Sequence, residues 1–372
     1  MHIALNCRCF LSPQFTGIGR YGYELVKALG ELDHTNQYYL YARKNIFDFK
    51  RRVPAQLKTK NIHERIDYFD RTVEKLIPDV DLYHALSPEI IPTQDKTKVI
   101  VTIHDLIFKA YPAGHTQNTI DLTEKNLVSC FQKAMKVICC SENTFKDLQA
   151  HYQFPRSKAV VIYPGINEKI FYRIDQEEER VAEEFLKDQG ITKPFILSVG
   201  TLEPRKNLKN MLEAFHILKK KGQFEGQFVV VGMKGWMSED LEHWIEDWKL
   251  TNDVIFLGYV STDGLRYLYN KAQVFLYPSF YEGFGFPIVE AFYCGAPVVT
   301  SNVSSCPEIA SDAALTVDPS KSEEIAESAA TIMADQNLRQ TLREKGFRRA
   351  MDFNFRKTAE KTLNVYQEVC RQ

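Results

Sequence analysis

The 372-residue sequence lacks several features, and each absence excludes a class of protein. None of its eight cysteines forms a C-x-x-C pair, and no His/Cys spacing suits zinc, so we expect no zinc site. No apolar run approaches the roughly 20 residues of a membrane-spanning helix. The amino-terminal stretch "MHIALNCRCF" lacks the charged region and long apolar region of a signal peptide. We therefore expect a reduced, cytoplasmic protein.

Charge excludes a second class of protein. The net charge is -1, from 47 Lys+Arg and 48 Asp+Glu, so bulk charge does not favour a nucleic-acid partner. The two halves differ, because residues 1–172 hold 23 Lys+Arg and 18 Asp+Glu, whereas the rest holds 24 and 30. The amino-terminal half therefore suits an anionic partner or surface, although an ordinary solvated face explains any single charged stretch.

What the sequence does contain is a regular alternation of short apolar runs and helical patterns. In the first half, the apolar runs indicate buried strands at residues 2–6, 38–42, 81–86, 98–105, 136–142 and 159–165. In the second half, they indicate strands at residues 194–200, 227–232, 253–260, 272–279, 297–301 and 313–318. Helical patterns lie between the runs. This alternation predicts an α/β protein with parallel, doubly wound sheets.

A charged stretch, residues 167–193, interrupts this alternation, and we interpret it as a linker that runs into a helix. The chain is also long for a single core, so we expect two α/β domains of similar size, divided near residue 172. In such sheets ligands bind at the carboxyl ends of the strands, and two facing sheets would line a shared cleft. Residues directly after strands are therefore the first candidates for a site.

The segment "TGIGRYG", residues 16–22, contains the G-x-G-x-x-G pattern of dinucleotide-binding proteins. Its context argues against NAD, because the glycines come about ten residues after the first strand and the next strand ends in Arg43 rather than in an acid. The alternative is a mobile glycine loop at Gly17 and Gly19 that approaches a phosphate at a helix amino terminus.

Two further groups of residues follow predicted strands. His104 and Asp105 end the strand pattern of residues 98–105, although a histidine at a strand end is, taken alone, more often structural than catalytic. Arg205 and Lys206 precede a helical pattern that begins near Asn207, which is a good N-cap. Two cations beside free helix N–H groups suit a diphosphate, although a solvated pair on a turn explains this segment equally well.

The stretch "YEGFGFPIVEAFYCGAPVVTS" holds two glutamates, Glu282 and Glu290, separated by seven residues. Two glycines and Pro287 disfavour helix before the proline, so we expect Glu282 on a turn and Glu290 in the first turn of the next helix. The helix dipole alone explains an acid in that first turn, but it does not explain Glu282. Because carboxylates accept hydrogen bonds from paired hydroxyls, we interpret the pair as binding two sugars on either side of an anion.

These segments, in this order, resemble the retaining glycosyltransferases of family four, which have the GT-B fold. The stretch "LYPSFYEGFGFPIVEAFYCGAPVVTSNVSSCPEIASDAAL" is similar to their Glu-x7-Glu block. The segments "GTLEPRKNL", "FLGYVSTDGLRYLY", "TIHD", "TGIGRYGYEL" and "YPGIN" are similar to other parts of the family, so the resemblance covers nearly the whole chain. It implies two Rossmann-like domains facing across a cleft. Residues 1–172, with a returning helix at 355–372, would bind the acceptor, and residues 173–354 the nucleotide sugar.

The resemblance also implies the catalytic residues. Glu282 would contact the donor sugar near its reacting carbon, Arg205 and Lys206 would neutralise the leaving diphosphate, and His104 would lie near the transferred sugar. Glu290 would bind the ribose hydroxyls. The other substrate-binding positions that it implies are Gly17, Gly19, Asp105, Gly200, Thr201, Tyr259, Val260, Gly283, Phe284 and Gly285.

The implied reaction moves a hexose from a nucleotide-diphosphate sugar to a saccharide or lipid-linked acceptor, with retention. Cations and helix dipoles at the phosphates stabilise the charge that develops there, so we expect neither a metal nor a cofactor besides the donor. Many relatives have arginine at the position of Thr201, which would leave more of this work to Arg205. Likeness to bacterial mannosyltransferases of surface-polysaccharide assembly favours GDP-mannose. A non-hydrolysing nucleotide-sugar epimerase and a non-catalytic nucleotide-sugar-binding protein stay open as alternatives.

The segment "YARKNIFDFKRRVPAQLKTK", residues 41–60, is basic and interleaved with apolar side chains. Its cations are Arg43, Lys44, Lys50, Arg51, Arg52, Lys58 and Lys60, and its only acid is Asp48. A solvated edge explains such a segment. Peripheral contact with an anionic membrane, at the inner face of the membrane, is the alternative that we test below.

Overall fold

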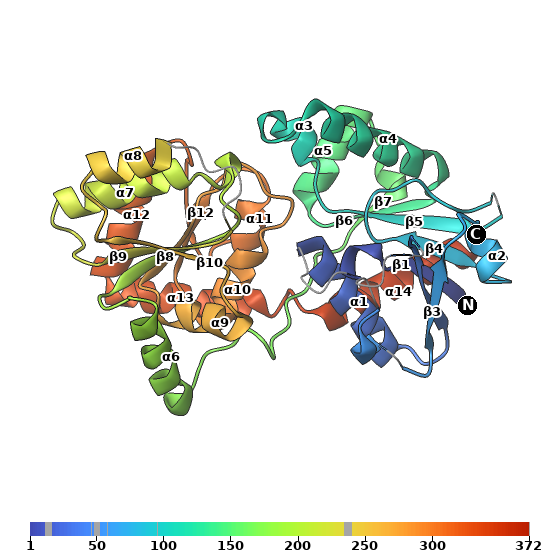
Figure 1. Ribbon diagram of the computed structural model, residues 1–372, viewed down its shortest axis with the longest axis horizontal. Coiled ribbons are helices and arrows are strands. Elements are labelled where there is room, and N and C mark those ends of the chain that lie inside the picture. Colours follow the sequence, from blue (N-terminus) through green and yellow to red (C-terminus); the bar gives the residue numbers. More distant parts are fainter. Residues whose placement is uncertain are drawn as a thin grey trace. The chain divides into compact units, whose positions relative to one another are not determined.

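The computed structural model describes residues 1–11, 17–45, 47, 53–57, 59–94, 96–233 and 240–371. It divides the chain into two compact units (Figure 1). Unit 1 comprises Met1–Gly165 and Phe353–Gln372, and unit 2 comprises Ile166–Asp352. The division near residue 172 falls inside unit 2, because the carbonyl of Ile170 accepts a hydrogen bond from Arg266 and that of Tyr172 accepts one from Asn270.

Unit 1 contains a seven-stranded sheet in the order β3-β2-β1-β4-β5-β6-β7, and all of its pairings are parallel. The strands are β1 (His2–Asn6), β2 (Gln37–Arg43), β3 (Ile62–Asp67), β4 (Leu82–Ala85), β5 (Lys98–Ile103), β6 (Lys136–Cys139) and β7 (Ala159–Val161). The strand β4 is buried throughout, and β5 and β6 contain runs of buried Val and Ile, which suits inner strands because a parallel strand is covered on both faces.

The strand β3 was not expected from the sequence. Its residues, "IHERID", place charged side chains among the apolar ones, and the strand is half exposed. It lies at the edge of the sheet and pairs only with β2. An edge strand needs less apolar surface than a central one, so the continuous apolar run that revealed its neighbours is missing.

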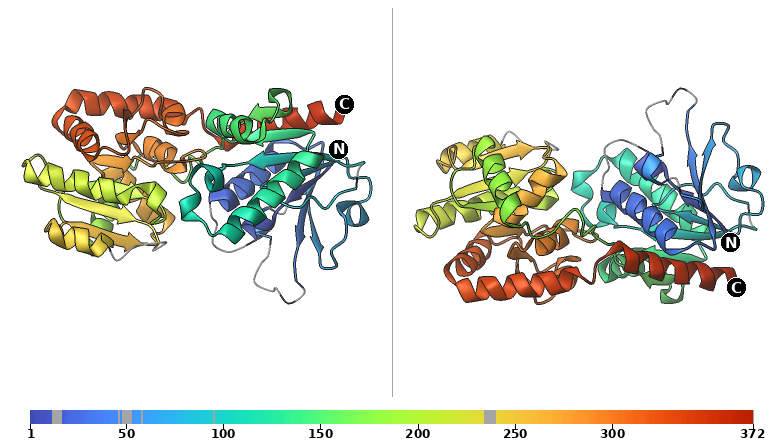
Figure 2. Two further views of the ribbon diagram at one scale, coloured as in Figure 1. Left: turned by 90° about the horizontal axis from the view of Figure 1, so that it is seen from above. Right: turned by 90° about the horizontal axis from the view of Figure 1, so that it is seen from below.

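Helices cover both faces of this sheet. They are α1 (Gly17–Leu32), α2 (Val73–Leu76), α3 (Ile107–Ala110), α4 (Gln117–Lys133), α5 (Glu142–Tyr152) and α14 (Phe355–Arg371). Helices α2 to α5 share one core with the strands, whereas α1 and α14 lie side by side on the other face (Figure 2). The carboxyl-terminal helix is fixed by buried polar groups, since the Tyr366 hydroxyl lies 2.6 Å from His84 Nδ1.

Unit 2 contains a six-stranded parallel sheet in the order β10-β9-β8-β11-β12-β13. Its strands are β8 (Phe195–Val199), β9 (Gln227–Val231), β10 (Val254–Gly258), β11 (Val274–Tyr277), β12 (Val298–Ser301) and β13 (Leu315–Val317). Its helices are α6 (Gln176–Asp188), α7 (Leu208–Lys220), α8 (Asp240–Asp247), α9 (Thr262–Lys271), α10 (Phe286–Cys294), α11 (Cys306–Ala310), α12 (Ser322–Ala334) and α13 (Gln336–Ala350).

The two faces of the unit 2 sheet carry different helices. Helices α7, α8 and α12 pack on one face and share its apolar core (Figure 1). Helices α9, α10 and α13 pack together on the other face. Both sheets are thus parallel and doubly wound, as the sequence predicted. No helix in the described ranges is long and apolar enough to cross a membrane.

Candidate active site

The strand order of unit 2 places a topological switch point between β8 and β11. The chain leaves β8 toward α7 on one face and leaves β11 toward α10 on the other (Figure 1). In open parallel sheets, ligands bind at the carboxyl ends of the strands at such a point. The two loops that start there carry the predicted Arg205, Lys206 and Glu282.

Arg205 and Lys206 lie in a short 3-10 turn, Pro204–Lys206, between β8 and α7. This confirms the position predicted for them, on the loop before a helix. Asn207 stands at the N-cap position directly before α7 but does not cap the helix with its side chain, and its backbone is left-handed, with φ 64°. The cap predicted at Asn207 is therefore wrong, because the side chain has other partners.

The Asn207 amide ties the two loops together. Its Nδ2 donates to the carbonyl of Pro278, in the loop after β11, at 2.9 Å, and to that of Pro319 at 2.5 Å. The backbone N–H of Phe280 also donates to the carbonyl of Arg205 at 2.8 Å. The left-handed backbone of Asn207 is thus held by buried hydrogen bonds, and it fixes the turn that presents the two cations.

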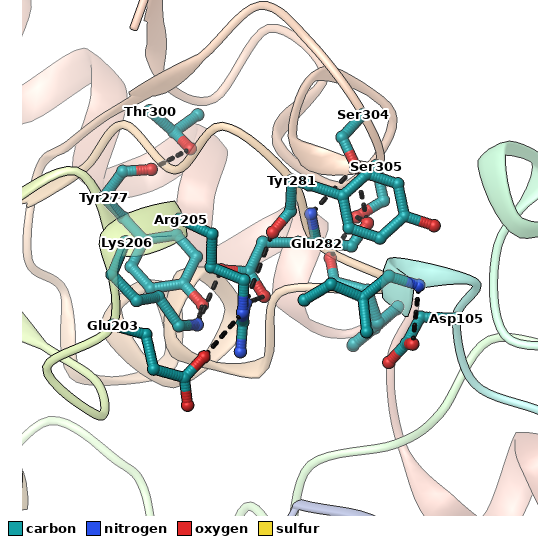
Figure 3. A network of polar contacts seen from close by, with 12 residues as sticks. Asp105, Glu203, Arg205, Lys206, Tyr277, Tyr281, Glu282, Thr300, Ser304 and Ser305 are labelled. Atoms are coloured by element: carbon teal, nitrogen blue, oxygen red, sulfur yellow. Dashed lines mark hydrogen bonds and ion pairs between the residues drawn. The ribbon is translucent and has the colours of Figure 1, made fainter. Parts of the chain in front are cut away.

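The charged side chains of both loops meet in one cluster (Figure 3). Lys206 Nζ lies 2.6 Å from Glu282 Oε1, and Arg205 Nη1 lies 3.0 Å from Glu282 Oε2. Lys206 Nζ also donates to the Tyr277 hydroxyl at 2.7 Å, and Arg205 Nε donates to Glu203 Oε2 at 2.8 Å. The cluster therefore pairs two cations with two carboxylates.

Burial and charge oppose each other at this cluster. The side chains of Glu282 and Lys206 are only 8% and 14% exposed. Burial works to raise the pKa of Glu282, but Lys206 and Arg205 outweigh it and lower that pKa to about 2. Burial lowers the pKa of Lys206 despite the opposing attraction of Glu282. The charges of the site are thus fixed in a largely dry environment, where electrostatic interactions are strong.

Two serines hold the backbone around Glu282. Ser304 Oγ accepts from the Glu282 N–H at 2.9 Å and lies 2.6 Å from the Glu282 carbonyl (Figure 3). Ser305 Oγ lies 2.9 Å from the Glu282 carbonyl and 3.0 Å from the Phe284 carbonyl. Both serines follow β12, the strand next to β11, so neighbouring strands supply the site and its support.

The turn after Glu282 leads into α10, whose N-cap is Gly285, with a left-handed φ of 97°. Only glycine adopts this conformation without strain, which agrees with a turn over Gly283, Phe284 and Gly285. Phe284 is buried, 4% exposed, so its side chain packs inward and the turn offers backbone rather than side chains.

The position expected for Glu290 is wrong. The helix α10 begins at Phe286 and has no acid in its first turn, so Glu290 lies in its second turn. The side chain is buried, 4% exposed, and Glu290 Oε2 accepts a hydrogen bond from the Tyr269 hydroxyl at 3.1 Å. The error has a simple cause, because the helix starts one residue before Pro287 and the glutamate moves from the fourth to the fifth helical position, beyond the first turn.

The remaining candidates of unit 2 lie at the same edge of the sheet. Gly200, after β8, has φ 154°, and the alkyl chain of Lys206 packs on it, since a Cβ there would lie 3.4 Å from Lys206 Cε. Thr201 is exposed. Gly258, the last residue of β10, is left-handed, with φ 63°; of the two residues after the strand, Tyr259 is 72% exposed and Val260 is half-buried. Nothing in these contacts assigns a role to the last two side chains.

In unit 1, His104 and Asp105 follow β5 as predicted, and both are half-buried. His104 Nε2 lies 2.8 Å from the Leu86 carbonyl, so this nitrogen is the donor, and His104 Nδ1 lies 3.3 Å from Cys140 Sγ. Burial lowers the pKa of His104. Asp105 Oδ1 accepts from the N–H of Ile107 at 3.1 Å. Both ring nitrogens of His104 are thus engaged within unit 1, and the histidine is neutral.

The glycine loop expected at Gly17 and Gly19 is a helix instead. The helix α1 begins at Gly17, so both glycines lie in its first turn. Thr16, with which the motif starts, lies outside the described residues. The conformation of the segment therefore differs from the prediction, although a helix amino terminus is itself a type of backbone that binds anions.

Sequence reasoning missed four residues of the cluster: Glu203, Tyr277, Ser304 and Ser305. Three of them had a usable signal, because Tyr277 ends β11 and Ser304 and Ser305 follow β12, and residues at the carboxyl ends of strands are candidates for a site. For Glu203 the sequence gives no such signal, because an acid two residues before Arg205 does not by itself indicate a functional contact. Its hydrogen bond to that arginine depends on the 3-10 turn.

Comparison with known families identifies both units. Residues 181–349 match the family described as "Glycosyl transferases group 1", and residues 15–169 match the one described as "Glycosyltransferase Family 4". The two matches together cover most of the chain and fall on separate units.

Individual proteins are similar to this chain over different lengths. The O-antigen chain mannosyltransferase B of Escherichia coli is 29% identical over 369 residues, which covers 95% of this chain and 96% of that protein. The O-antigen chain mannosyltransferase RfbU of Salmonella typhimurium is 28% identical, over 59% of this chain and 56% of its own. The crystal structure of WaaG, a glycosyltransferase involved in lipopolysaccharide biosynthesis, matches with a TM-score of 0.73 and 16% identity, over 98% of this chain and 99% of that one.

Proposed function

Because this chain belongs to the family 4, group 1 glycosyltransferases and has their GT-B fold, we propose that it moves a hexose from a nucleotide-diphosphate sugar to a saccharide or lipid-linked acceptor, with retention. The reaction class, glycosyl transfer, follows from the family. The donor, the stereochemistry and the acceptor are the parts that we propose.

The observation that carries the proposal is the cluster of Arg205, Lys206 and Glu282 at the switch point. A departing nucleoside diphosphate needs positive charge aimed at its phosphates. Here both cations already pair with carboxylates, so a bound diphosphate would replace Glu282 or Glu203 as the partner of at least one cation. Glu282 would then be free to accept a hydrogen bond from a hydroxyl of the donor sugar.

We propose that the transfer needs no metal ion. The cations of the cluster can supply the charge that a divalent ion supplies elsewhere. Within the described residues no three His, Cys, Asp or Glu side chains are grouped as a metal site would require. The acidic pair Asp79 and Asp81 could be suspected of binding a metal ion, but it precedes β4, and Asp81 Oδ2 accepts from the N–H of His2 at 2.7 Å. The pair therefore lies at the amino-terminal edge of its sheet, away from the carboxyl ends of the strands, where ligands bind.

For the donor we propose GDP-mannose. The support is the similarity to O-antigen mannosyltransferases, of which one aligns over nearly its whole length. The proposal places the protein in cell-surface polysaccharide synthesis, at the cytoplasmic face of a membrane, where a lipid-linked acceptor would be exposed. In unit 1, the apolar side chains of Phe47 and Phe69 are 81% and 69% exposed in the loops after β2 and β3, at the edge that carries the basic segment. Lys50, Arg51, Arg52 and Lys58 of that segment lie outside the described residues.

The proposal is tested by turnover with GDP-mannose, with UDP- and ADP-sugars as competing donors. Replacing Arg205 or Lys206 by alanine should remove about 2–4 kcal/mol of transition-state stabilisation, as the loss of one charge-stabilising donor does elsewhere. This loss should appear as lower turnover at saturating donor. The matched control is Lys209→Ala, because Lys209 lies in the first turn of α7, just after the two cations, but its Nζ lies over the Trp244 ring, 4.8 Å from the ring centre.

The outcomes separate the alternatives. Slow release of the nucleoside diphosphate supports a transferase, isomerisation of the donor sugar supports an epimerase, and neither reaction supports a binding protein. If turnover falls less than tenfold in both alanine variants, or equally in the Lys209 control, the assignment of the cluster is wrong.

A further inference from the structure

A second polar cavity lies at the opposite edge of the unit 2 sheet. Its volume is about 210 Å³, and the residues that matter in its lining are Arg173, Glu179, Asn270, Gly295, Gln340 and Arg343. Asn270 lies near the end of α9, just before β11, and Gly295 follows α10, just before β12. The cavity is therefore at the amino ends of the strands, whereas the candidate active site is at their carboxyl ends.

Two guanidinium groups line this cavity. Arg173 Nη2 donates to the carbonyl of Arg343 at 2.9 Å, so the two side chains belong to one local arrangement. The guanidinium of Arg173 packs against Gly295, because a Cβ at that glycine would lie only 2.9 Å from Arg173 Nε. A larger residue at Gly295 would push the arginine out of the cavity.

Arg343 is the less expected of the two. Its Nε is buried and has no hydrogen-bond partner among the described residues. Burial, together with the nearby charges of Arg339 and Arg173, lowers the pKa of Arg343. An unsatisfied buried N–H on a charged group is costly, and like charges nearby add to that cost.

No described acid offsets these charges. Among the described residues, Arg173 donates to the Arg343 carbonyl at 2.9 Å and its guanidinium lies 5.1 Å from the centre of the Phe347 ring, and neither partner is an acid. Glu179 lines the cavity, but its carboxylate lies 3.5 Å from Lys271 Nζ, and Arg339 Nη1 donates to Gln273 at 3.0 Å. The carboxyl end of α10 accounts for one cation, Arg173, through the helix dipole. It does not account for Arg343, which is half-buried and whose Nε has no hydrogen-bond partner among the described residues.

We propose that this cavity binds a phosphate-type anion between Arg173 and Arg343. The planar guanidinium fork matches a phosphate group, and Arg is the side chain that binds phosphate in this two-pronged way. The cavity is larger than one phosphate group, so it also has room for part of a phosphate monoester. Arg173 lies in the segment that enters unit 2, and Ile174 N–H is bonded to Asn270 Oδ1 at 3.1 Å, so the anion would bind where this segment is attached to α9.

The test is calorimetric titration of the whole protein with inorganic phosphate and, separately, with glucose 6-phosphate, at constant ionic strength set with sodium chloride. We expect saturable binding by the wild type and at least a tenfold loss of affinity in Arg343→Met and in Arg173→Gln. The second variant changes an exposed residue, so it keeps the test valid if the first does not fold. Tighter binding of glucose 6-phosphate than of phosphate would identify the monoester as the ligand, and equal binding the free anion.

Lys206→Ala separates this cavity from the candidate active site. It should keep the phosphate affinity of the wild type, and both arginine variants should bind GDP within twofold of the wild type. The proposal is overturned if the wild type shows no saturable binding, if both arginine variants bind phosphate normally, or if Lys206→Ala alone abolishes binding.

Discussion

At the scale of single residues, Glu282 and Glu290 are expected to do different work. Glu290→Gln should weaken binding of GDP at least tenfold, because we assign its carboxylate to the ribose hydroxyls and a bidentate charged acceptor is lost. Glu282→Gln should leave GDP affinity nearly intact but lower turnover, because its partner is the sugar. Calorimetric titration with GDP and steady-state turnover measure the two effects.

The buried hydrogen bond from Tyr269 to Glu290 supplies the control for this experiment. Tyr269→Phe removes that bond without touching the carboxylate, so it reports any indirect loss through the helix α10. If both glutamate variants lose the same GDP affinity, or if Tyr269→Phe loses as much as Glu290→Gln, the separate roles of the two glutamates are wrong.

The ion pair of Glu282 should also make stability depend on acid. Its pKa is lowered from an ordinary 4.5 to about 2, so the stabilisation is present above pH 4.5 and is lost as the pH falls toward 2. A shift of this size corresponds to about 3 kcal/mol at neutral pH. The gap in unfolding free energy between wild type and Glu282→Gln should therefore shrink as the pH is lowered from 7 to 3.

Urea unfolding followed by tryptophan fluorescence measures this gap in unit 2, since all three tryptophans belong to that unit. Glu225→Gln is the control, because Glu225 pairs with Lys219 in the same unit at 3.6 Å and its side chain is 75% exposed. A gap between wild type and Glu282→Gln that does not change with pH would contradict the ion pair.

At the scale of elements, the attachment of α14 depends on a glycine. A Cβ at Gly165 would lie 2.2 Å from the backbone nitrogen of Phe355 and 2.4 Å from the carbonyl carbon of Asn354. Backbone atoms cannot turn aside as a flexible side chain can, so Gly165→Ala must displace the start of α14. We expect a loss of stability at the upper end of the roughly 1–3 kcal/mol typical of overpacking.

Amide hydrogen exchange in Phe355–Arg371 and the melting temperature measure this displacement. The matched control is Gly114→Ala, since a Cβ at Gly114 would meet nothing closer than Tyr111 Cδ1 at 3.8 Å. Equal melting temperatures and unchanged exchange in α14 for the two variants would show that the start of the helix can move without cost.

At the scale of the whole molecule, the basic segment of unit 1 should bind anionic membranes. Each cation close to the lipid contributes roughly 1 kcal/mol, and high salt screens this attraction. Wild type should co-sediment with vesicles that contain anionic lipid at low salt, and not with neutral vesicles. A Lys50/Arg51/Arg52→Ser variant should lose this binding, and Phe69→Ser should weaken it.

The matched control is Val181→Ser, which changes an apolar side chain on α6 of unit 2 that is 48% exposed. If wild type ignores anionic vesicles at low salt, the basic segment is only a solvated edge. A soluble saccharide then becomes the better candidate for the acceptor.

The sequence by itself determined the two α/β units and the places where functional residues stand. Apolar runs, helical patterns and the glycines and prolines between them are local, so Arg205, Lys206 and Glu282 were assigned to loops after strands before any contact was known. The sequence did not predict the edge strand β3, because the exposed face of that strand carries charge. It also did not predict the exact start of α10, because helix ends depend on surrounding contacts.

Only the tertiary structure decided which residues touch. Arg205 and Glu282 meet because β8 and β11 are neighbours in the sheet, and Ser304 joins them because β12 comes next. The left-handed Asn207 and the buried position of Glu290 follow from hydrogen bonds to distant segments. Arg173 and Arg343 are 170 positions apart in the sequence, yet they line one cavity. In each case residues that are distant in the sequence meet through tertiary packing, and no local pattern of side chains encodes that packing.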